Sequence, residues 1–204
     1  MFDFVRWPKI PRFNREWEIT EKIDGTNGIL LWSAEYHPEW CLGTGVMADE
    51  PDQMYLYAGS RTRWLTRQAD NHGFANWASD YAPALATLGK GRHFGEWWGP
   101  GIQRRYGLAE KRFSLFDVNK YNDLPMPANV TTVPLIARVS APGLDYKLEG
   151  ILNDLRSTGS FAAPGFMNPE GIVMRHSQSG ERFKVLLEGD EAPKSVNMLG
   201  VGNV

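Results

Sequence analysis

The sequence has few or none of the residues and motifs that define several common classes of protein. One cysteine among 204 residues excludes an internal disulfide framework and a thiolate zinc site. The four histidines form no HxH or HxxxH pair, which argues against a histidine metal site. The chain also has no GxxxxGKS/T phosphate loop, no GxGxxG fingerprint and no GxSxG element. Any chemistry must therefore come from another set of residues.

Long apolar runs and a surplus of positive charge are also absent. No stretch approaches the roughly 18 apolar residues of a membrane span. The opening MFDFVRWPKIPRF is interrupted by Arg6, Lys9 and two prolines, so it does not resemble the apolar core of a signal peptide. A reducing, cytoplasmic setting is expected from the single cysteine. The formal net charge of -2 does not indicate a broad basic surface for nucleic acid, although it is compatible with a local basic groove.

The remaining pattern indicates one folded domain of mixed type over residues 1–204. Hydrophobic residues make up 42% and charged residues 23% of the chain, close to globular averages. Helical spacing of apolar residues occurs at 74–88 and at 148–155, with a stop near Gly159. Pro- and Gly-rich loops are expected at 38–53, 99–107, 121–130 and 157–169. Strand-like runs dominate and predict an α+β fold: EWEITEKI, NGILLWS, MYLYAGS, RHFGEWW, RFSLFDV, TTVPLIARV, EGIVMR and ERFKVLLE.

The sharpest local signal is EKIDGTNG at residues 21–28, which contains a KxDG element from Lys22 to Gly25. A shuffled chain of this composition would contain about 0.04 such elements by chance. Taken alone, the element is equally compatible with a surface lysine that precedes an Asp-Gly turn. The rest of the sequence therefore has to distinguish a lysine with a chemical role from a lysine in a surface turn.

Six elements in a fixed order resemble those of the covalent nucleotidyltransferases, which comprise ATP-dependent DNA and RNA ligases and mRNA capping enzymes. This resemblance implies a nucleotidyltransferase domain of mainly antiparallel sheets flanked by a few helices. The similar elements are EKIDGTNG (motif I), AGSRTRW at 58–64 (the element after the first hairpin), FGEWWGPG at 94–101 (motif III), FSLFDV at 113–118 (motif IIIa), PEGIVMR at 169–175 (motif IV) and ERFKVLLE at 181–188 (motif V).

The resemblance implies that Lys22 is a nucleophile. Its amine would attack the α-phosphate of ATP, release pyrophosphate and form a lysyl-AMP phosphoramidate. A lysine in this role must be deprotonated near neutral pH, and burial and nearby cations both lower the pKa of a lysine. The phosphate charge must also be neutralised, and we expect Mg²⁺ or Mn²⁺ bound by Glu170 to contribute to this.

The resemblance also assigns the surroundings of the adenine. Glu21, through its backbone, and Ile23 would frame the base, and Val173 would line its other side. Phe116 would stack on the base, although core packing explains this residue equally well.

Further matched positions would contact the ribose and the phosphates. The family commonly has lysines where this chain has Arg175 and Arg182, and an arginine fork contacts phosphate differently from a lysine. The residues expected to hold the ribose and position the phosphate are Asn27, Arg61 and Glu96, and those expected to face the phosphates are Arg175, Arg182 and Lys184.

The loop GPGIQRRYG at 99–107 follows the strand that carries Glu96. Gln103, Arg104 and Arg105 in this loop, together with Arg63, are the residues that we expect to contact the phosphates of a polynucleotide. Such contacts would read the backbone and give little sequence preference.

Three phrases, PKIPRFNREWEITEKIDGTNG, SRTR and GEWWG, resemble the RNA-ligase branch more than the DNA-ligase branch. We therefore expect an ATP-dependent RNA ligase that joins 3′-OH and 5′-phosphate ends, which a nicked duplex could present. Only 20 residues follow Lys184. An appended OB-fold with a basic motif VI, or a helical C-terminal domain, is therefore not expected, and adenylation should be the weaker step unless an accessory protein helps.

Three alternatives stay open on the sequence. They are a minimal DNA ligase, a capping-type guanylyltransferase, and a nucleotide- or RNA-binding module without catalysis. The sequence does not indicate the oligomeric state or which RNA would be joined, and it gives no reason to expect a membrane partner.

Overall fold

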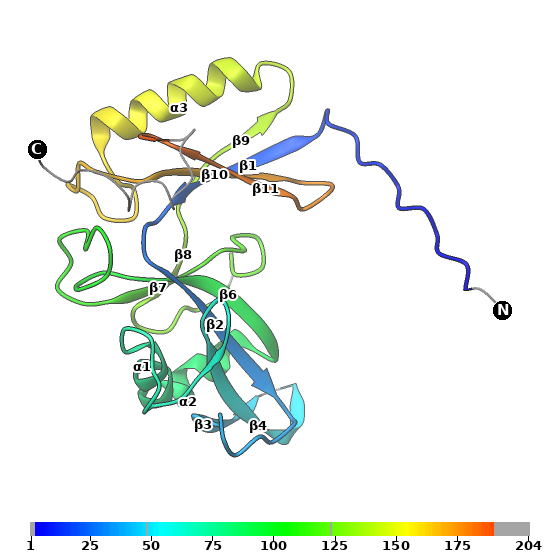
Figure 1. The fold of residues 1–204 in the computed structure, drawn as a ribbon, viewed down its shortest axis with the longest axis vertical. Coiled ribbons are helices and arrows are strands. Elements are labelled where there is room, and N and C mark those ends of the chain that lie inside the picture. The colour runs from blue at the N-terminus through cyan, green and yellow to red at the C-terminus, as the bar shows by residue number, and fades with distance from the viewer. Residues whose placement is uncertain (1–2, 48, 123, 190–204) are drawn as a thin grey trace, which may run out of the picture.

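A computed structural model describes residues 3–47, 49–122 and 124–189 and arranges them as two layers, each built on a β-sheet (Figure 1). The elements in chain order are β1 (Glu16–Lys22), β2 (Thr26–Ser33), β3 (Gly43–Met47), β4 (Glu50–Gly59), β5 (Trp64–Leu65), α1 (Phe74–Asp80), α2 (Ala82–Leu85), the 3-10 turn η1 (Ala86–Leu88), β6 (Gly91–Trp98), β7 (Arg112–Leu115), β8 (Val130–Thr132), β9 (Leu135–Ser140), α3 (Leu144–Thr158), β10 (Gly171–His176) and β11 (Arg182–Leu186).

The first layer is an antiparallel sheet of order β11-β10-β1-β9, with α3 packed on one face. Ile19 of β1, Ile172 of β10 and Leu155 of α3 belong to its buried core. Because side chains alternate along a strand, Lys22 and its neighbours Thr20 and Glu18 lie on the face away from this core. That face of the sheet is turned toward the second layer.

The second layer is a larger sheet of order β3-β4-β2-β6-β7-β8, with β5 paired to β4. Helices α1 and α2 cover one face, where Phe74 and Leu85 pack among Leu30, Trp32 and Leu56. The pairing of β7 with β8 is parallel, and the other pairs are antiparallel. The predicted α+β fold of mainly antiparallel sheets is therefore confirmed.

The chain passes between the layers at two places, after β1 and after β8. A third buried cluster lies at these crossings and includes Ile23, Val133, Trp98 and Tyr106. Lys22 is the last residue of β1 and stands at the first crossing. The fold therefore places the KxDG element at the junction of the two layers.

Three expectations about local structure are wrong. The helix expected over 74–88 is broken at Tyr81, because Pro83 has no N–H to donate to the preceding turn and instead lies in the first turn of α2. The run TTVPLIARV divides at Pro134 into β8 and β9, which lie in different sheets. The loop expected at 38–53 contains β3, which pairs with β4. The second expected helix is confirmed as α3, and Gly159 follows its last residue with a φ of 81°.

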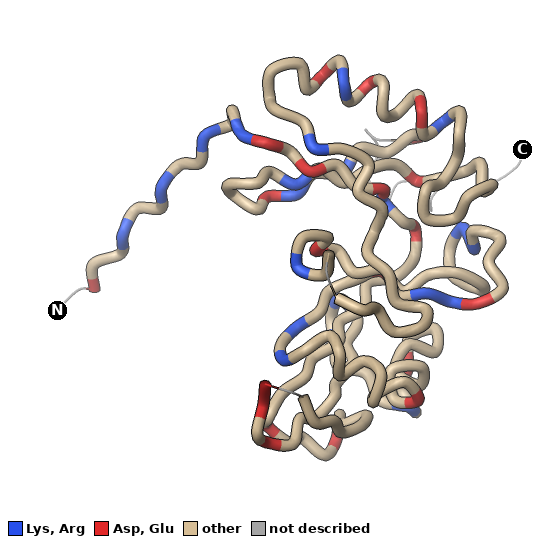
Figure 2. Tube along the Cα trace, turned by 180° about the vertical axis from the view of Figure 1, so that it is seen from behind, with Lys and Arg blue, Asp and Glu red and all other residues tan. Residues whose placement is uncertain are grey.

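The segment before β1 extends away from both layers and carries several basic residues (Figure 2). Its apolar side chains are exposed, with 92% of Phe4 and 81% of Trp7 accessible to solvent. The residues that the structure describes form no helix that is long and apolar enough to cross a membrane.

Candidate active site

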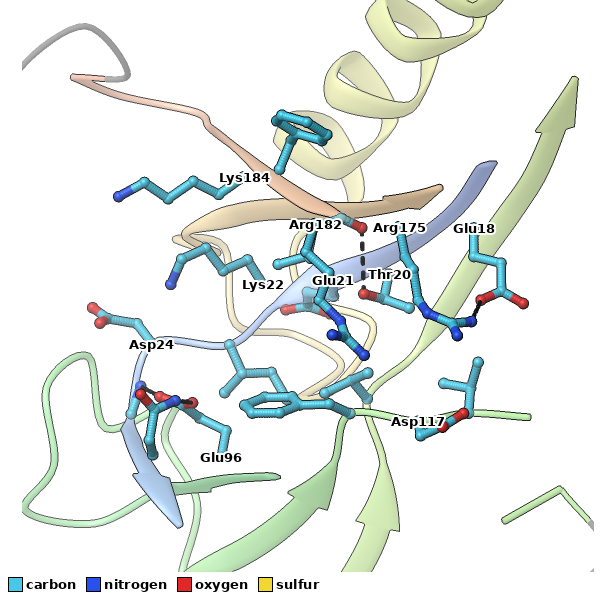
Figure 3. Close-up of a pocket in the computed structure, with 18 of the residues that line it drawn as sticks. Glu18, Thr20, Glu21, Lys22, Asp24, Glu96, Asp117, Arg175, Arg182 and Lys184 are labelled. Carbon is cyan, nitrogen blue, oxygen red and sulfur yellow. Dashed lines mark hydrogen bonds and ion pairs between the residues drawn. The ribbon is translucent and has the colours of Figure 1, made fainter. Parts of the chain in front are cut away.

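A cavity of about 810 Å³ lies between the two layers, at the end of β1 (Figure 3). Its walls come from β1, β2 and β6, from the segment after β7, and from β10 and β11. Residues from all six motif-like elements either line this cavity or, like Glu170, contact a residue that does. The predicted site residues that line it are Glu21, Lys22, Ile23, Asn27, Arg61, Glu96, Phe116, Val173, Arg175, Arg182 and Lys184.

Lys22 and Glu170 form an ion pair, with 2.5 Å between Nζ and Oε2. The antiparallel register of β1 and β10 produces it, because Lys22 lies opposite Gly171, the residue after Glu170. Only 5% of the Glu170 side chain is exposed. A Cβ atom at Gly171 would lie 2.2 Å from the carbonyl oxygen of Val185, so glycine is required directly after this carboxylate.

The Asp-Gly turn after Lys22 is held by Glu96 of β6. The Gly25 N–H donates to Oε1 at 3.0 Å, and Nδ2 of Asn27 donates to Oε2 at 3.1 Å. A Cβ atom at Gly25 would lie 2.5 Å from the carbonyl oxygen of Trp97, which explains the glycine of the KxDG element. Burial raises the pKa of Glu96 to about 7, although the positive charge of Lys22 opposes this shift.

Glu21 contributes a side-chain role that the sequence did not indicate. Its carboxylate accepts hydrogen bonds from Oγ of Ser160 at 2.6 Å and from the backbone N–H of Ala162 at 2.8 Å. Burial raises the pKa of this carboxyl group. Glu21 therefore anchors the loop that follows α3 against β1. Ser160 lies 139 residues away in the chain, so no sequence spacing could have revealed this contact.

The cations of the cavity fall into two groups. Arg61, Arg182 and Lys184 are exposed and have no hydrogen bond or ion pair to side chains within the described part of the chain. In Figure 3, the Lys22 and Lys184 side chains point toward the same end of the cavity. Arg175 instead points to Glu18, with 2.8 Å between Nη1 and Oε2. Arg175 also lines the cavity, and its expected contact with phosphates stays a prediction.

The family of the chain is decided by comparison with known proteins. Residues 15–186, more than four-fifths of the chain, match the RNA ligase family. The chain belongs to the RNA ligase family. A comparison with curated protein sequences gives no match.

Solved structures of the Naegleria gruberi RNA ligase are similar in fold. A point variant with ATP and Mn is 19% identical over 85% of this chain and 49% of that chain, with a TM-score of 0.54. The same ligase with PPi is 20% identical over 85% and 50% of the two chains, with a TM-score of 0.53. Another variant with AMP and Mn is 17% identical, with a TM-score of 0.52. The present chain spans about half the length of these structures.

The residues predicted to contact a polynucleotide differ in the contacts that they make within this RNA ligase family member. Arg63 donates through Nη1 to the carbonyl oxygen of Ala69 at 2.7 Å and through Nη2 to that of Asp70 at 3.2 Å. Arg104 turns inward and contacts Asp24. Both arginines are therefore hydrogen-bonded within the protein, and their expected contact with a polynucleotide stays a prediction. Gln103 and Arg105 are exposed on the 99–107 loop, and their contact with a polynucleotide stays a prediction.

The carboxylates near Lys22 suit a divalent cation of the Mg²⁺ type. The described residues contain no group of three or more His, Cys, Asp or Glu side chains that could hold a metal ion by themselves. Mg²⁺ commonly uses one or two carboxylates and completes its shell with water and substrate phosphates. Glu170, buried at the end of the cavity beside Lys22, fits this pattern as a single protein ligand.

Proposed function

We propose that this protein is an ATP-dependent RNA ligase with Lys22 as the nucleophile. The observation that carries the proposal is the position of the Lys22 amine. It lies at the end of a cavity large enough for a nucleotide and beside a buried carboxylate, and the same cavity is lined by three exposed cations on β11 and the loop after β4.

The reaction would proceed in three nucleophilic displacements, each at a phosphorus atom. The Nζ lone pair of Lys22 attacks the α-phosphorus of ATP, pyrophosphate leaves, and the amine proton passes to solvent. An oxygen of the RNA 5′-phosphate then attacks the lysyl-AMP phosphorus, and the Lys22 amine leaves with a proton. Finally the 3′-OH of the second RNA end attacks the activated 5′-phosphorus, its proton passes to solvent, and AMP leaves.

The residues of this chain support these steps by charge and position. The hydrogen bond from Lys22 to Glu170 orients the amine at the end of the cavity. Arg182 and Lys184 are available to contact phosphate oxygens, because no group in the described part of the chain pairs with them. A divalent ion held by Glu170 would add neutralisation of phosphate charge.

Intact-mass measurement tests the proposal. Protein incubated with ATP and Mg²⁺ or Mn²⁺ should gain the mass of one AMP, and Lys22→Ala should gain none while remaining folded. Lys147→Ala is the matched control, because this lysine lies on the outer helix α3. An adduct that persists in the Lys22 variant would contradict the assignment.

The substrate is tested separately. We propose RNA ends as the substrate, with a nicked duplex as the form that could hold both ends together. Matched nicked duplexes with an RNA or a DNA strand at the break would separate an RNA ligase from a DNA ligase. Labelling with α-labelled GTP in place of ATP would instead indicate a capping-type enzyme. The cytoplasmic setting and the need for an accessory protein stay predictions.

A further inference from the structure

The 99–107 loop between β6 and β7 has an unusual backbone. Gln103, Arg105 and Tyr106 have positive φ angles of 41°, 62° and 53°, a region that side chains other than glycine rarely adopt. Such strain persists only where surrounding contacts hold it, and it often occurs at functional sites. In this loop, successive side chains point alternately toward solvent and toward the protein. Gln103 and Arg105 are exposed, whereas Arg104 and Tyr106 turn toward the protein.

Arg104 connects the two segments that carry the reacting pair. Its Nε donates to Oδ2 of Asp24 at 3.1 Å, and Asp24 is two residues after Lys22. Its Nη1 donates to Oδ1 of Asn168 at 2.6 Å and to the Asn168 carbonyl oxygen at 2.9 Å, and Asn168 is two residues before Glu170. The planar guanidinium fixes both directions at once, which a lysine cannot do.

Tyr106 contacts the same two segments. Its hydroxyl oxygen accepts a hydrogen bond from the Asp24 N–H at 2.8 Å. Its ring, only 2% exposed, lies 4.6 Å from the ring of Phe166 between centroids, just before Asn168 in the chain. The loop therefore joins the Lys22–Asp24 turn to the segment that leads into Glu170 through two independent side chains.

We propose that Arg104, assisted by Tyr106, is a positioning residue for the attack of Lys22 and does not contact the polynucleotide. Lys22 belongs to β1, and Glu170 precedes β10, whereas Arg104 comes from the other layer. Its hydrogen bonds hold the ends of both segments in register at the junction of the layers. This inference rests on the proposed ligase function, because it concerns the rate at which the Lys22 adduct forms.

The experiment measures single-turnover adenylation over a series of ATP concentrations. For Arg104→Ala we expect the rate constant at saturating ATP to fall roughly 10- to 100-fold, because a displacement of about 1 Å costs up to this much. The ATP concentration for half-saturation should change less than about threefold, because Arg104 does not line the nucleotide cavity. Arg104→Lys should recover part of the rate, since a lysine can restore one of the two contacts.

Arg67→Ala is the matched control. Arg67 also donates to several side chains, those of Asn76, Ser79 and Asp80, but on α1 and far from the reacting pair in the fold. This variant loses a comparable set of hydrogen bonds, so its adenylation rate should stay that of the unaltered protein. If Arg67→Ala slows adenylation as much as Arg104→Ala does, general destabilisation explains both and the positioning role is wrong.

A second readout separates positioning from substrate binding. RNA affinity, measured by filter binding at several salt concentrations, should be unchanged in Arg104→Ala. Normal adenylation with lost RNA affinity would overturn the inference. If Arg104→Ala does not fold, Tyr106→Phe, which removes only the hydroxyl, should slow adenylation a few-fold at unchanged half-saturation, and an unchanged rate would contradict the proposal. Failure of the unaltered protein to form any adduct would reject the proposed function instead.

Discussion

Two groups of charged residues in the cavity differ in how far they are already paired within the protein. In the paired group around Lys22, Lys22 pairs with Glu170, Asp24 pairs with Arg104, and Glu96 accepts two hydrogen bonds. In the unpaired group, on β11 of the same sheet as Lys22, Arg182 and Lys184 are exposed and lack such partners within the residues that the structure describes.

For the proposed reaction, this difference suggests a division of roles between the two groups. A lysine that acts as the nucleophile needs a defined position, and hydrogen bonds already fix the surroundings of Lys22. The cations that meet phosphate keep their donors in water, where an unpaired charge is well solvated, and exchange water for phosphate oxygens on binding. The paired group should therefore control the rate of reaction, and the unpaired group the affinity for phosphate.

The largest effect should come from Glu170 in the paired group. Glu170→Gln keeps the shape of the side chain but removes the charge that pairs with Lys22 and would hold a divalent ion. Single-turnover adenylation should fall roughly 10³-fold. Glu188→Gln, an exposed glutamate beyond β11, is the control. Equal rates for the two variants would show that the Glu170 carboxylate has no part in the reaction.

A smaller effect is expected in the unpaired group, where Lys184 can be compared with Arg175, a cation of the same sheet that is paired with Glu18. Lys184→Ala should lower adenylation about 10²-fold at limiting ATP, because charge-assisted hydrogen bonds to phosphate are lost. Arg175→Ala should lower the rate much less and the free energy of unfolding more, because it leaves the buried carboxylate of Glu18 without its Nη1 donor. The reverse order of effects would show that Arg175, and not Lys184, contacts phosphate.

The pH dependence of stability should reveal the burial of Glu96. Its pKa is raised to about 7 in the folded protein, so its contribution to stability is complete below the unfolded pKa and is lost as pH rises through 7. Between pH 5 and 7.5 the free energy of unfolding should fall by about 2 kcal/mol relative to that of Glu96→Gln. Urea unfolding of both proteins at each pH measures this difference, and parallel curves would refute the shift.

The smallest effect concerns the outward residues of the 99–107 loop. Replacing Gln103 and Arg105 together by alanine should weaken RNA binding a few-fold and reduce its salt slope by about one. Lys22 adduct formation should not change, because neither residue lines the nucleotide cavity. If RNA binding keeps its salt dependence in this variant, Gln103 and Arg105 do not contact the polynucleotide.

Many residues of the candidate site could be predicted from the sequence, because they belong to short local patterns or to motifs that occur in a fixed order along the chain. The strand-like runs EWEITEKI and EGIVMR predicted the strands β1 and β10, and the six motif-like elements identified residues that line or adjoin one cavity. Glycines at 25 and 171 belong to the motifs because a Cβ atom would collide with backbone there. The strands β3 and β5 escaped detection, since one lies in a Gly-rich segment and the other has two residues.

The sequence by itself determined most of the strands, the helix α3 and the choice of Lys22 as the candidate nucleophile. Only the tertiary structure decided which arginines are free and which are held. Arg104 meets Asp24 from 80 residues away, and Arg175 meets Glu18 from 157 residues away. Periodicity reports the face of one element on which a side chain lies, whereas an ion pair depends on how two elements distant in the chain are packed together.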